Sequence, residues 1–480
     1  MQRNLIGGEI CGEPGRSAAV YNPATGGVVE EVTVGSAGEV DAAVAAAVRA
    51  LSERGWAENA SLRSSVLYEW AKEIEAHLEE LTWLLSLENG KLLSESEAEL
   101  SATVDTLRFA AGQARTLEGR SLTLAPDLYG QVVLQPVGVV AVIVPWNWPV
   151  LLTLRELAPA LAAGNTAVVK PAMEAPLTVM RVLEFAMEIP GFPAGVVNCV
   201  AGEGGEVGEL LVSHPNVRMV SFTGSVQTGK KIMRSASECL KKVVLELGGK
   251  SPSIVFEDAD LNKALAILVR GAYGTAGQNC MAVARILVQD TIFEEVEKRF
   301  VDLTESIKVG PGLDPTSKMG PVISERQLER IHTLVEQGLS SGGKLLAGGS
   351  RIEGGSMSKG CFYAPTVIAE MPLSSPAVQE EIFGPVVSLE RFADEEEACA
   401  LANGTPYGLV ASVWTSDHNR AERVARRLEV GTVWINTYLK TFPEAESGGM
   451  KQSGLGRSRG RFGIYEYMEP KHIVSDIAEG

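Results

Sequence analysis

The sequence predicts an α/β protein built on parallel sheets, and three observations support that prediction. Residues 137–144 form a continuous run rich in β-branched side chains, as expected of a strand that is buried on both faces. From this run to residue 235, short apolar segments alternate with helical patterns of about ten residues or more. A second region of the same kind begins after Glu246. Such alternation is the signature of parallel sheets covered by helices on both faces.

The segments before the first predicted sheet are expected to form a frame around it. Residues 1–35 read as short strands and turns, and residues 39–51 carry alanines and valines at helical spacing. Residues 60–115 carry long helical patterns with acidic faces, such as 67–87. We expect these to be scaffold helices with solvated outer faces and no part in chemistry.

The first α/β region has four expected strands and four expected helices. The strands are 137–144, 166–169, 196–200 and 217–222, and the helices are 150–163, 176–187, 205–213 and 224–235. Ligands of such sheets bind beyond the carboxyl ends of the strands. The loops that carry Asn147, Lys170 and Gly224 all lie at that end.

The second region repeats this organisation with longer connections. We expect strands at 253–256 and 286–288, helices at 261–273, 293–307 and 325–338, and a buried strand at 432–436. A glycine-rich loop and a short tail complete the chain.

Length and charge restrict the class of protein. A chain of 480 residues is long enough for two or three domains. Its formal net charge of −17 argues against nucleic acid or an anionic membrane as a partner. No apolar segment is long enough to span a bilayer, and no signal peptide is visible. The six cysteines form no CxxC pair, so we expect no metal site and a cytoplasmic enzyme in a reducing compartment.

The segment 274–280, Gly-Thr-Ala-Gly-Gln-Asn-Cys, is the candidate nucleophile loop. A nucleophilic cysteine needs partial exposure and a lowered pKa, and small neighbours let a substrate approach its sulfur. A lone cysteine is also a common small core residue, so this motif alone leaves both interpretations open.

Two further polar residues follow predicted strands. Asn147 lies in a loop between two prolines and two tryptophans, where its amide can donate to a developing oxyanion. Glu246 ends a strand before Gly248, where a carboxylate can act as a general base on water. A turn asparagine and a salt-bridged glutamate are the alternatives. The five histidines lie outside these motifs, which disfavours a Cys-His hydrolase.

The segment 222–230 follows a strand and opens a helix at Gly224 and Ser225. Free N–H groups at such a helix start bind phosphate. The segment nearly matches a P-loop, but Lys231 stands where that motif requires a magnesium-binding hydroxyl, which disfavours a phosphotransferase. A simple helix cap is the structural alternative.

Together with residues 380–385, Glu-Glu-Ile-Phe-Gly-Pro, these motifs strongly resemble the aldehyde dehydrogenase superfamily over nearly the whole chain. The resemblance implies that the Cys280 thiolate attacks an aldehyde and that Asn147 holds the oxyanion of the thiohemiacetal. Hydride then passes to NAD or NADP, and Glu246 activates water to hydrolyse the thioester. Members that transfer the acyl group to coenzyme A usually lack this glutamate, so hydrolysis is expected.

The resemblance also assigns cofactor-binding and substrate residues. The expected cofactor contacts are Trp146, Lys170 at the adenosine ribose, Gly224 and Ser225 at the pyrophosphate, Glu381 at the nicotinamide ribose, and Phe383 near it. The expected substrate contacts are Arg155, Trp148 and Ser447.

Several residues depart from the usual pattern. Met173 stands where strict NAD users have glutamate, with Glu174 next to it, so NADP use stays open. Arg155 replaces a frequent tryptophan and resembles members acting on semialdehydes, lactaldehyde or aromatic aldehydes. It can bind a substrate carboxylate or form a structural ion pair. Glu156 replaces the usual lysine, and Gly274 replaces the second arginine of succinic semialdehyde enzymes.

The resemblance further implies an aldehyde dehydrogenase-like division of the chain and a homodimer or homotetramer. The expected parts are a Rossmann-type dinucleotide-binding domain (1–117 and 138–248), an α/β catalytic domain (249–430), a small β oligomerisation element (118–137 and 459–480) and a return segment lining the active site (431–458). A small polar, carboxylated or aromatic aldehyde is the expected substrate. A succinate-semialdehyde dehydrogenase and a catalytically silent relative are the alternatives.

Overall fold

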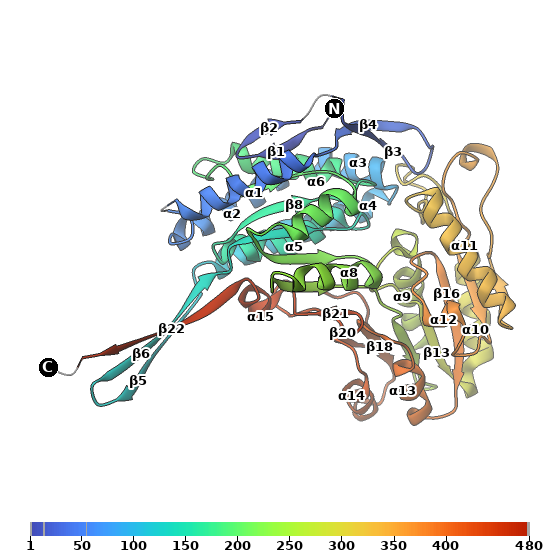
Figure 1. Cartoon of the computed structure of the whole chain (residues 1–480). Helices are drawn as coiled ribbons and strands as arrows, with labels where there is room; N and C mark the ends of the chain where they lie inside the picture. Colours follow the sequence, from blue (N-terminus) through green and yellow to red (C-terminus); the bar gives the residue numbers. More distant parts are fainter. Residues whose placement is uncertain (1, 13–14, 54, 478–480) are drawn as a thin grey trace.

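The computed structural model describes residues 2–12, 15–53 and 55–477. The C-terminal end of the expected oligomerisation element (478–480) and four positions of the first expected domain (1, 13, 14 and 54) lie outside the described residues. Two sheets covered by helices form the body, and a narrow three-stranded arm projects from it (Figure 1).

The first sheet has eight strands, five of them parallel. In spatial order they are β2 (Glu9–Cys11), β1 (Asn4–Ile6), β9 (Val197–Cys199), β8 (Thr166–Lys170), β7 (Val139–Ile143), β10 (Val217–Thr223), β11 (Lys242–Glu246) and β21 (Gly454–Leu455). From β7 the chain proceeds outward through β8 to β9 and then returns to β10 on the other side. This reversal between β7 and β10 is the switch point where open α/β sheets bind ligands.

Helices cover both faces of this sheet because its central strands are apolar on both sides. In β7, Val140 and Val142 join one core cluster, whereas Val139, Ala141 and Ile143 join another. The first core is shared with α2 (Ala60–Ala76), α3 (Leu78–Asn89), α4 (Leu93–Gln113), α5 (Pro149–Ala162) and α6 (Leu177–Glu188). The second is shared with α1 (Ala37–Ser52), α7 (Glu209–Ser213) and α8 (Val226–Ser237).

The second sheet has seven strands and is also covered on both faces. Its order is β14 (Lys344–Ala347), β15 (Thr366–Ala369), β16 (Val386–Phe392), β13 (Arg285–Gln289), β12 (Pro252–Val255), β18 (Val410–Trp414) and β19 (Thr432–Ile435). One face packs against α9 (Leu261–Tyr273), α10 (Phe293–Glu305), α11 (Glu325–Ser340) and α12 (Pro376–Gln379). The other packs against α13 (Glu395–Asn403) and α14 (His418–Arg427).

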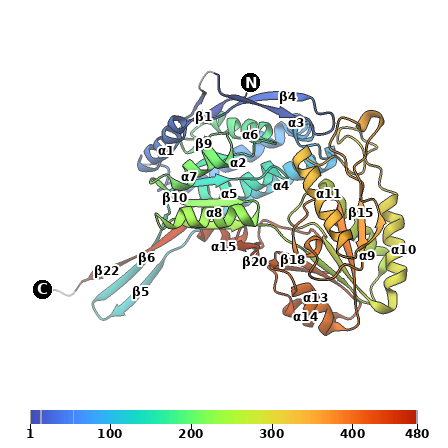
Figure 2. The ribbon, with the colours of Figure 1, turned by 45° about the vertical axis from the view of Figure 1, so that its right-hand side comes forward.

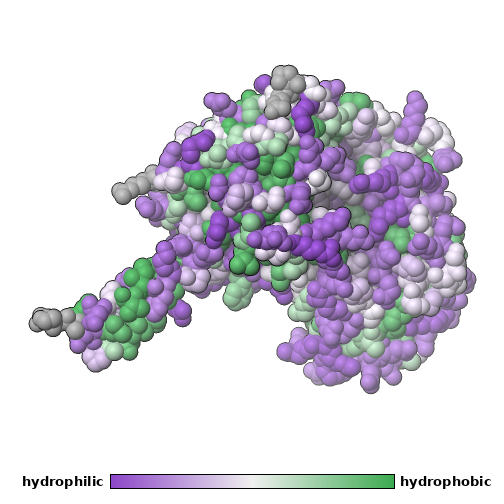
Figure 3. Space-filling model, viewed as in Figure 1, coloured by the Kyte–Doolittle hydropathy of each residue, from purple (hydrophilic) through white to green (hydrophobic). Residues whose placement is uncertain are grey.

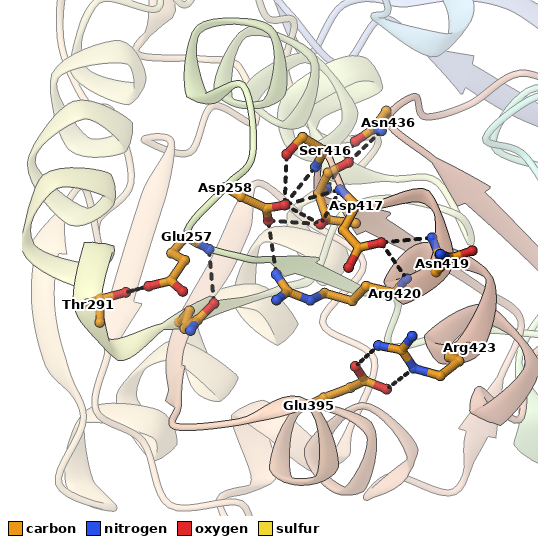
Figure 4. A network of polar contacts seen from close by, with 12 residues as sticks. Glu257, Asp258, Thr291, Glu395, Ser416, Asp417, Asn419, Arg420, Arg423 and Asn436 are labelled. Atoms are coloured by element: carbon orange, nitrogen blue, oxygen red, sulfur yellow. Dashed lines mark hydrogen bonds and ion pairs between the residues drawn. The ribbon is translucent and has the colours of Figure 1, made fainter.

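A polar network ties the carboxyl ends of β12 and β18 together (Figure 4). The Asp258 carboxylate, just after β12, accepts hydrogen bonds from the hydroxyls of Thr415 and Ser416 and from the backbone N–H of Asp417. It also pairs with Arg420 of α14 at 3.1 Å. Because its acceptors are occupied by protein donors, we read this network as structural.

The arm consists of β5 (Arg120–Ala125), β6 (Leu128–Pro136) and β22 (Met468–Asp476) in the antiparallel order β22-β6-β5. It points away from the body in both ribbon views (Figures 1 and 2). Its strands fall within the two segments expected to form an oligomerisation element. The remaining elements are two small strand pairs, β3 (Ser17–Tyr21) with β4 (Val28–Thr33) and β17 (Tyr407–Gly408) with β20 (Met450–Lys451), and helix α15 (Gly460–Tyr465).

The structure corrects three expected elements. The helical pattern over 67–87 is two helices, since α2 ends at Ala76 and α3 begins at Leu78. The helix expected over 205–213 opens with a π-turn, Gly204–Gly208, before α7. The strand expected to be buried near 432–436 is an edge strand with only Trp434 buried, and it extends the second sheet past residue 430. No helix among the described residues is long and apolar enough to cross a membrane.

Candidate active site

The Cys280 loop follows α9 through a turn of unusual backbone conformation. Thr275 and Ala276 have φ angles of 51° and 52°, and Gly277 follows with φ 68°. Residues other than glycine rarely adopt this region, so packing must hold the turn in place. A Cβ on Gly277 would lie 2.1 Å from the backbone oxygen of Gly384, which explains a glycine there. The same close approach brings the segment 380–385 against the nucleophile loop.

Cys280 is half-buried, and all six cysteines are free thiols. Burial raises the pKa of the Cys280 thiol to about 12, although the nearby Arg155 guanidinium opposes the shift. The expected lowering of the pKa is therefore absent from this structure. Because Glu381 and Glu246 add negative charge near the sulfur, activation must come from a change in this environment.

Asn147 lies in the loop between β7 and α5, and its side chain faces the Cys280 loop. Its Nδ2 atom donates a 2.9 Å hydrogen bond to the backbone oxygen of Gln278. An amide nitrogen carries two protons, so a second one remains to point at a substrate oxygen. The side chain is only 3% exposed, which strengthens any such hydrogen bond.

The Asn147 loop is held by a buried ion pair that the sequence did not reveal. Lys91 Nζ lies 2.5 Å from Glu99 Oε2 and donates to the backbone oxygen of Asn147 at 2.7 Å. Glu99 Oε1 in turn accepts from the backbone N–H of Val150 and Leu151 and so caps α5. Both side chains are fully buried, in the region 60–115 for which we expected no role in chemistry.

Glu95 lies on α4, the helix that also carries Glu99, and it holds the nucleophile loop. Its Oε1 atom accepts a 2.6 Å hydrogen bond from the backbone N–H of Thr275, at the start of the strained turn. Burial raises the pKa of this carboxyl, an effect that the hydrogen bonds from Thr275 and Leu92 oppose. Helix α4 therefore supports both loops of the site. An acidic face on a helical pattern could not indicate this, because such faces are usually solvated.

Glu246 is the last residue of β11, next to the switch point. Its Oε1 atom lies 3.2 Å from the hydroxyl oxygen of Ser458. Burial raises its pKa to about 7, with Arg155 and Arg457 opposing the shift and Glu156 adding to it. A carboxyl that ionises near neutrality suits general base catalysis.

Two expected cofactor positions lie along the same end of the sheet. Ser225 caps α8, its hydroxyl accepting from Thr228 N–H at 3.3 Å, and Gly224 lies between β10 and this cap. Lys170 ends β8, is 4% exposed and donates to the Pro171 backbone oxygen at 2.7 Å. Burial lowers the pKa of Lys170 to about 8.

Glu381 is a charged neighbour of Cys280 and lies against the turn after β11. It accepts a 3.1 Å hydrogen bond from Gly249 N–H, and a Cβ on Gly248 would lie 2.0 Å from Glu381 Oε2. Only glycine therefore fits beneath this carboxylate. Burial raises the pKa of Glu381 to about 7, opposed by the hydrogen bond from Gly249 and by Lys250.

Trp146 and Phe383 link two motifs that are far apart in the sequence. Their rings meet edge to face, with centroids 5.3 Å apart. Phe383 has a φ of 58°, so its backbone is held in an uncommon conformation to present this ring.

Of the three expected substrate residues, Arg155 is a charged neighbour of Cys280. Arg155 is 7% exposed, and its guanidinium donates to Glu156 at 2.7 Å and to Thr223 at 3.0 Å, which is the structural ion pair left open above. Ser447 pairs through its backbone with Ser458, close to Glu246. The buried side-chain polar atoms of Trp148 and Ser447 have no hydrogen-bond partner among the described residues.

The two residues at the usual cofactor-selecting position have different surroundings. Met173 packs against the core of the first sheet. Glu174 lies 3.5 Å from Arg326 in an ion pair. Position 173 therefore places no negative charge near a 2′-phosphate, and the charge of Glu174 is partly balanced by Arg326.

The chain is similar to known proteins over almost its full length. The model of the aldehyde dehydrogenase family matches residues 11–473. Betaine aldehyde dehydrogenase of Bacillus subtilis (strain 168) is 41% identical over 475 residues, covering 98% of this chain and 97% of that protein. Phenylacetaldehyde dehydrogenase of Pseudomonas fluorescens is 40% identical over 480 residues, covering 98% and 95%.

Solved structures of the same family have the same fold as this chain. Betaine aldehyde dehydrogenase of Staphylococcus aureus, in complex with NAD+, has a TM-score of 0.98 and 39% identity, covering 100% of this chain and 96% of that one. These relatives give no support to the succinate-semialdehyde alternative. The expected fold class and the expected class of NAD(P)-dependent aldehyde dehydrogenases are confirmed. With the fold, the motifs and these matches in agreement, the chain belongs to the aldehyde dehydrogenase family.

Proposed function

We propose that this protein oxidises an aldehyde to a carboxylic acid through a thioester on Cys280. The observation that carries the proposal is the convergence of three groups from distant segments. The Asn147 amide contacts the Cys280 loop, and Cys280 and Glu246 share Arg155 as a charged neighbour. Nucleophile, oxyanion donor and general base are therefore together.

Each of these residues has one role in the proposed sequence. The Cys280 thiolate forms a C–S bond with the aldehyde carbon, and the Asn147 Nδ2 proton stabilises the resulting oxyanion. After oxidation, Glu246 takes a proton from a water molecule that attacks the thioester carbon. The C–S bond then breaks, the acid leaves, and the thiolate is restored.

The residues present suit a nicotinamide dinucleotide. The capped start of α8 offers N–H groups to a pyrophosphate, and Lys170 and Glu381 offer a cation and a carboxylate to ribose hydroxyls. The absence of a side chain at Gly248 leaves the Glu381 carboxylate room to do so. When bound, the cofactor supplies the hydride acceptor.

Both NAD+ and NADP+ are proposed as cofactors, because no carboxylate at position 173 repels a 2′-phosphate. The variant Met173→Glu should raise the KM for NADP+ while changing that for NAD+ little. Equal changes for both cofactors would remove Met173 from this role.

We propose an uncharged polar or aromatic aldehyde as the substrate. Two guanidinium nitrogens of Arg155 already donate hydrogen bonds to Glu156 and Thr223. Arg155 is therefore poorly placed to bind the carboxylate of a substrate as well. Phenylacetaldehyde is oxidised by a relative that is 40% identical, as its name states.

The test is a panel of aromatic, amino, trimethylammonium and carboxylated aldehydes, each assayed with NAD+ and with NADP+. We expect acid product and reduced cofactor in equal amounts, and neither with Cys280→Ala. Absence of reduced cofactor across the panel would favour a catalytically silent relative. A clear preference for carboxylated or for cationic aldehydes would overturn the substrate proposal.

We also propose that the arm joins copies of this chain. Apolar residues gather on the arm in the space-filling view (Figure 3). The exposed large apolar side chains of its strands are Leu124, Tyr129, Val133, Ile473 and Val474. A second copy suits this surface, because β5 and β22 also leave backbone edges open to another strand. Light scattering should therefore give a mass of two or four chains, and a monomer at all concentrations would contradict this.

A further inference from the structure

Two buried carboxylates share a single hydroxyl group beside Cys280. The Ser458 Oγ atom lies 2.7 Å from Glu156 Oε1 and 3.2 Å from Glu246 Oε1. All three side chains are buried, with Glu156 and Ser458 each 1% exposed and Glu246 6%. The two carboxyl oxygens are therefore within about 6 Å of each other, close enough for their charges to interact strongly.

The hydroxyl cannot serve both carboxylates as a donor, because it carries one proton. A second ionised carboxylate at this distance would face an oxygen lone pair and remain unsatisfied, which is costly in a buried site. One of the two glutamates must therefore carry a proton for both contacts to be hydrogen bonds.

The partners of Glu156 identify it as the ionised member. Its Oε1 accepts from Arg155 Nε at 2.7 Å as well as from Ser458. Its Oε2 accepts from the hydroxyls of Tyr467 at 2.8 Å and Ser221 at 3.3 Å. Four donors and an adjacent cation make Glu156 a fully satisfied carboxylate. The Ser458 proton therefore belongs to Glu156, and Ser458 accepts a proton from Glu246.

We propose that Glu156, acting through the Ser458 hydroxyl, holds a proton on Glu246 and so sets the pH above which Glu246 can act as a base. Glu156 and Ser458 are positioning residues in this scheme, and it rests on the proposed role of Glu246 in hydrolysis. Glu246 must lose the held proton before it can take one from the attacking water.

Other charges also face Glu246. Arg155 lies on α5 beside Glu156, Arg457 and Arg459 come from the C-terminal segment, and the Cys280 thiol faces it across the site. The arginines favour the ionised form of Glu246, whereas the negative charge of Glu156 favours the protonated form. Removal of Glu156 should therefore ease the ionisation of Glu246.

The test uses 4-nitrophenyl acetate, an activated ester that needs no known aldehyde. NAD+ is present throughout, because the pKa of the Cys280 thiol is raised in the ligand-free protein. Attack by the Cys280 thiolate forms the acetyl thioester and releases 4-nitrophenolate as a burst. Hydrolysis of the thioester then sets the steady rate. Stopped-flow traces between about pH 5 and pH 9 thus separate acylation from the step in which Glu246 acts.

We expect the steady rate to fall on the acidic side of neutrality in the natural protein. In Glu156→Gln and Ser458→Ala this fall should move to lower pH by about one unit, because each change removes support for the proton on Glu246. Ser458→Thr retains the hydroxyl and should restore the original profile. Ser412→Ala, which alters a buried hydroxyl that contacts Ser253 and Trp414, is the matched control.

The direction of the Ser458→Ala shift decides between two arrangements. If Ser458 instead donated to an ionised Glu246, its removal would move the fall to higher pH, and the proposal would be wrong. An unchanged profile would also overturn it. If Glu156→Gln fails to fold, the comparison of Ser458→Ala with Ser458→Thr still shows whether the Ser458 hydroxyl supports the proton on Glu246. Release of 4-nitrophenolate that continues unchanged in Cys280→Ala would refute the proposed function itself.

Discussion

The side-chain nitrogen of Asn147 lies 2.9 Å from the backbone oxygen of Gln278, two residues before Cys280. This hydrogen bond joins the switch-point loop of the first sheet to the nucleophile loop of the second region. The amide is thus fixed before any substrate arrives, and preorganised donors of this kind are the most effective in catalysis.

Asn147→Ala should lower the rate of Cys280 acylation by about 100- to 1000-fold, the usual effect of losing one oxyanion donor. The burst phase with 4-nitrophenyl acetate measures this directly. Asn403→Ala removes an exposed amide that donates to the backbone oxygen of Arg427, and it should leave the burst unchanged. A normal burst in Asn147→Ala would exclude Asn147 from the oxyanion site.

The raised pKa of Cys280 predicts slow alkylation in the absence of ligands. Because the thiolate is the reactive form, labelling by iodoacetamide should be slow near neutral pH and rise about tenfold per pH unit on the alkaline side. Mass spectrometry of the labelled peptides follows each cysteine separately, with the exposed Cys239 as an internal reference. Labelling of Cys280 faster than Cys239 at neutral pH would contradict the prediction.

Lys91→Met should destabilise the protein by about 3 kcal/mol or more, since it leaves the Glu99 charge buried without its partner. The midpoint of urea unfolding measures the loss. Lys72→Met breaks an exposed pair with Glu69 and should change the unfolding midpoint little. The Lys91 variant should also acylate slowly, because its ammonium holds the Asn147 loop. Equal midpoints for the two variants would show that the buried pair is not important for stability.

Cofactor affinity should depend on pH through Glu381. Only the ionised carboxylate can accept from two ribose hydroxyls, and this form is lost as the pH falls through about 7. Calorimetric titration with NAD+ should therefore show weaker binding on the acidic side of neutrality. Glu381→Gln should bind weakly at every pH, whereas Glu380→Gln should keep the natural profile. A pH-independent affinity in the natural protein would remove Glu381 from the ribose site.

The motifs of the site could be found in the sequence because each lies in a short segment with a distinct local pattern. The β-branched run of β7 predicted the central strand, and the loops after β7 and β10 indeed meet at the switch point. Cys280, Asn147 and Glu246 were singled out in this way, whereas Glu381 was assigned only through the resemblance to the family. Their roles remain proposals until the variants are measured.

The support of the site could not be predicted, because it depends on contacts between distant segments. Glu95 and Glu99 look like ordinary charged residues of a solvated helix, and Lys91 looks like one of a loop before it. Only the packing of α4 against its neighbours buries them. The pKa of Cys280 depends on the burial of its loop and on Arg155. Likewise, the contact between Ser458 and two glutamates joins three separate parts of the chain.

The projecting arm has a consequence for how the protein behaves on dilution. A ribbon of three strands has little interior of its own, so most of its stability would come from the copy that covers it. Thermal stability should then rise with protein concentration, as mass action requires of any assembly that forms only from folded chains. Very dilute samples would lose the arm's contribution first, while the two helix-covered sheets stay folded.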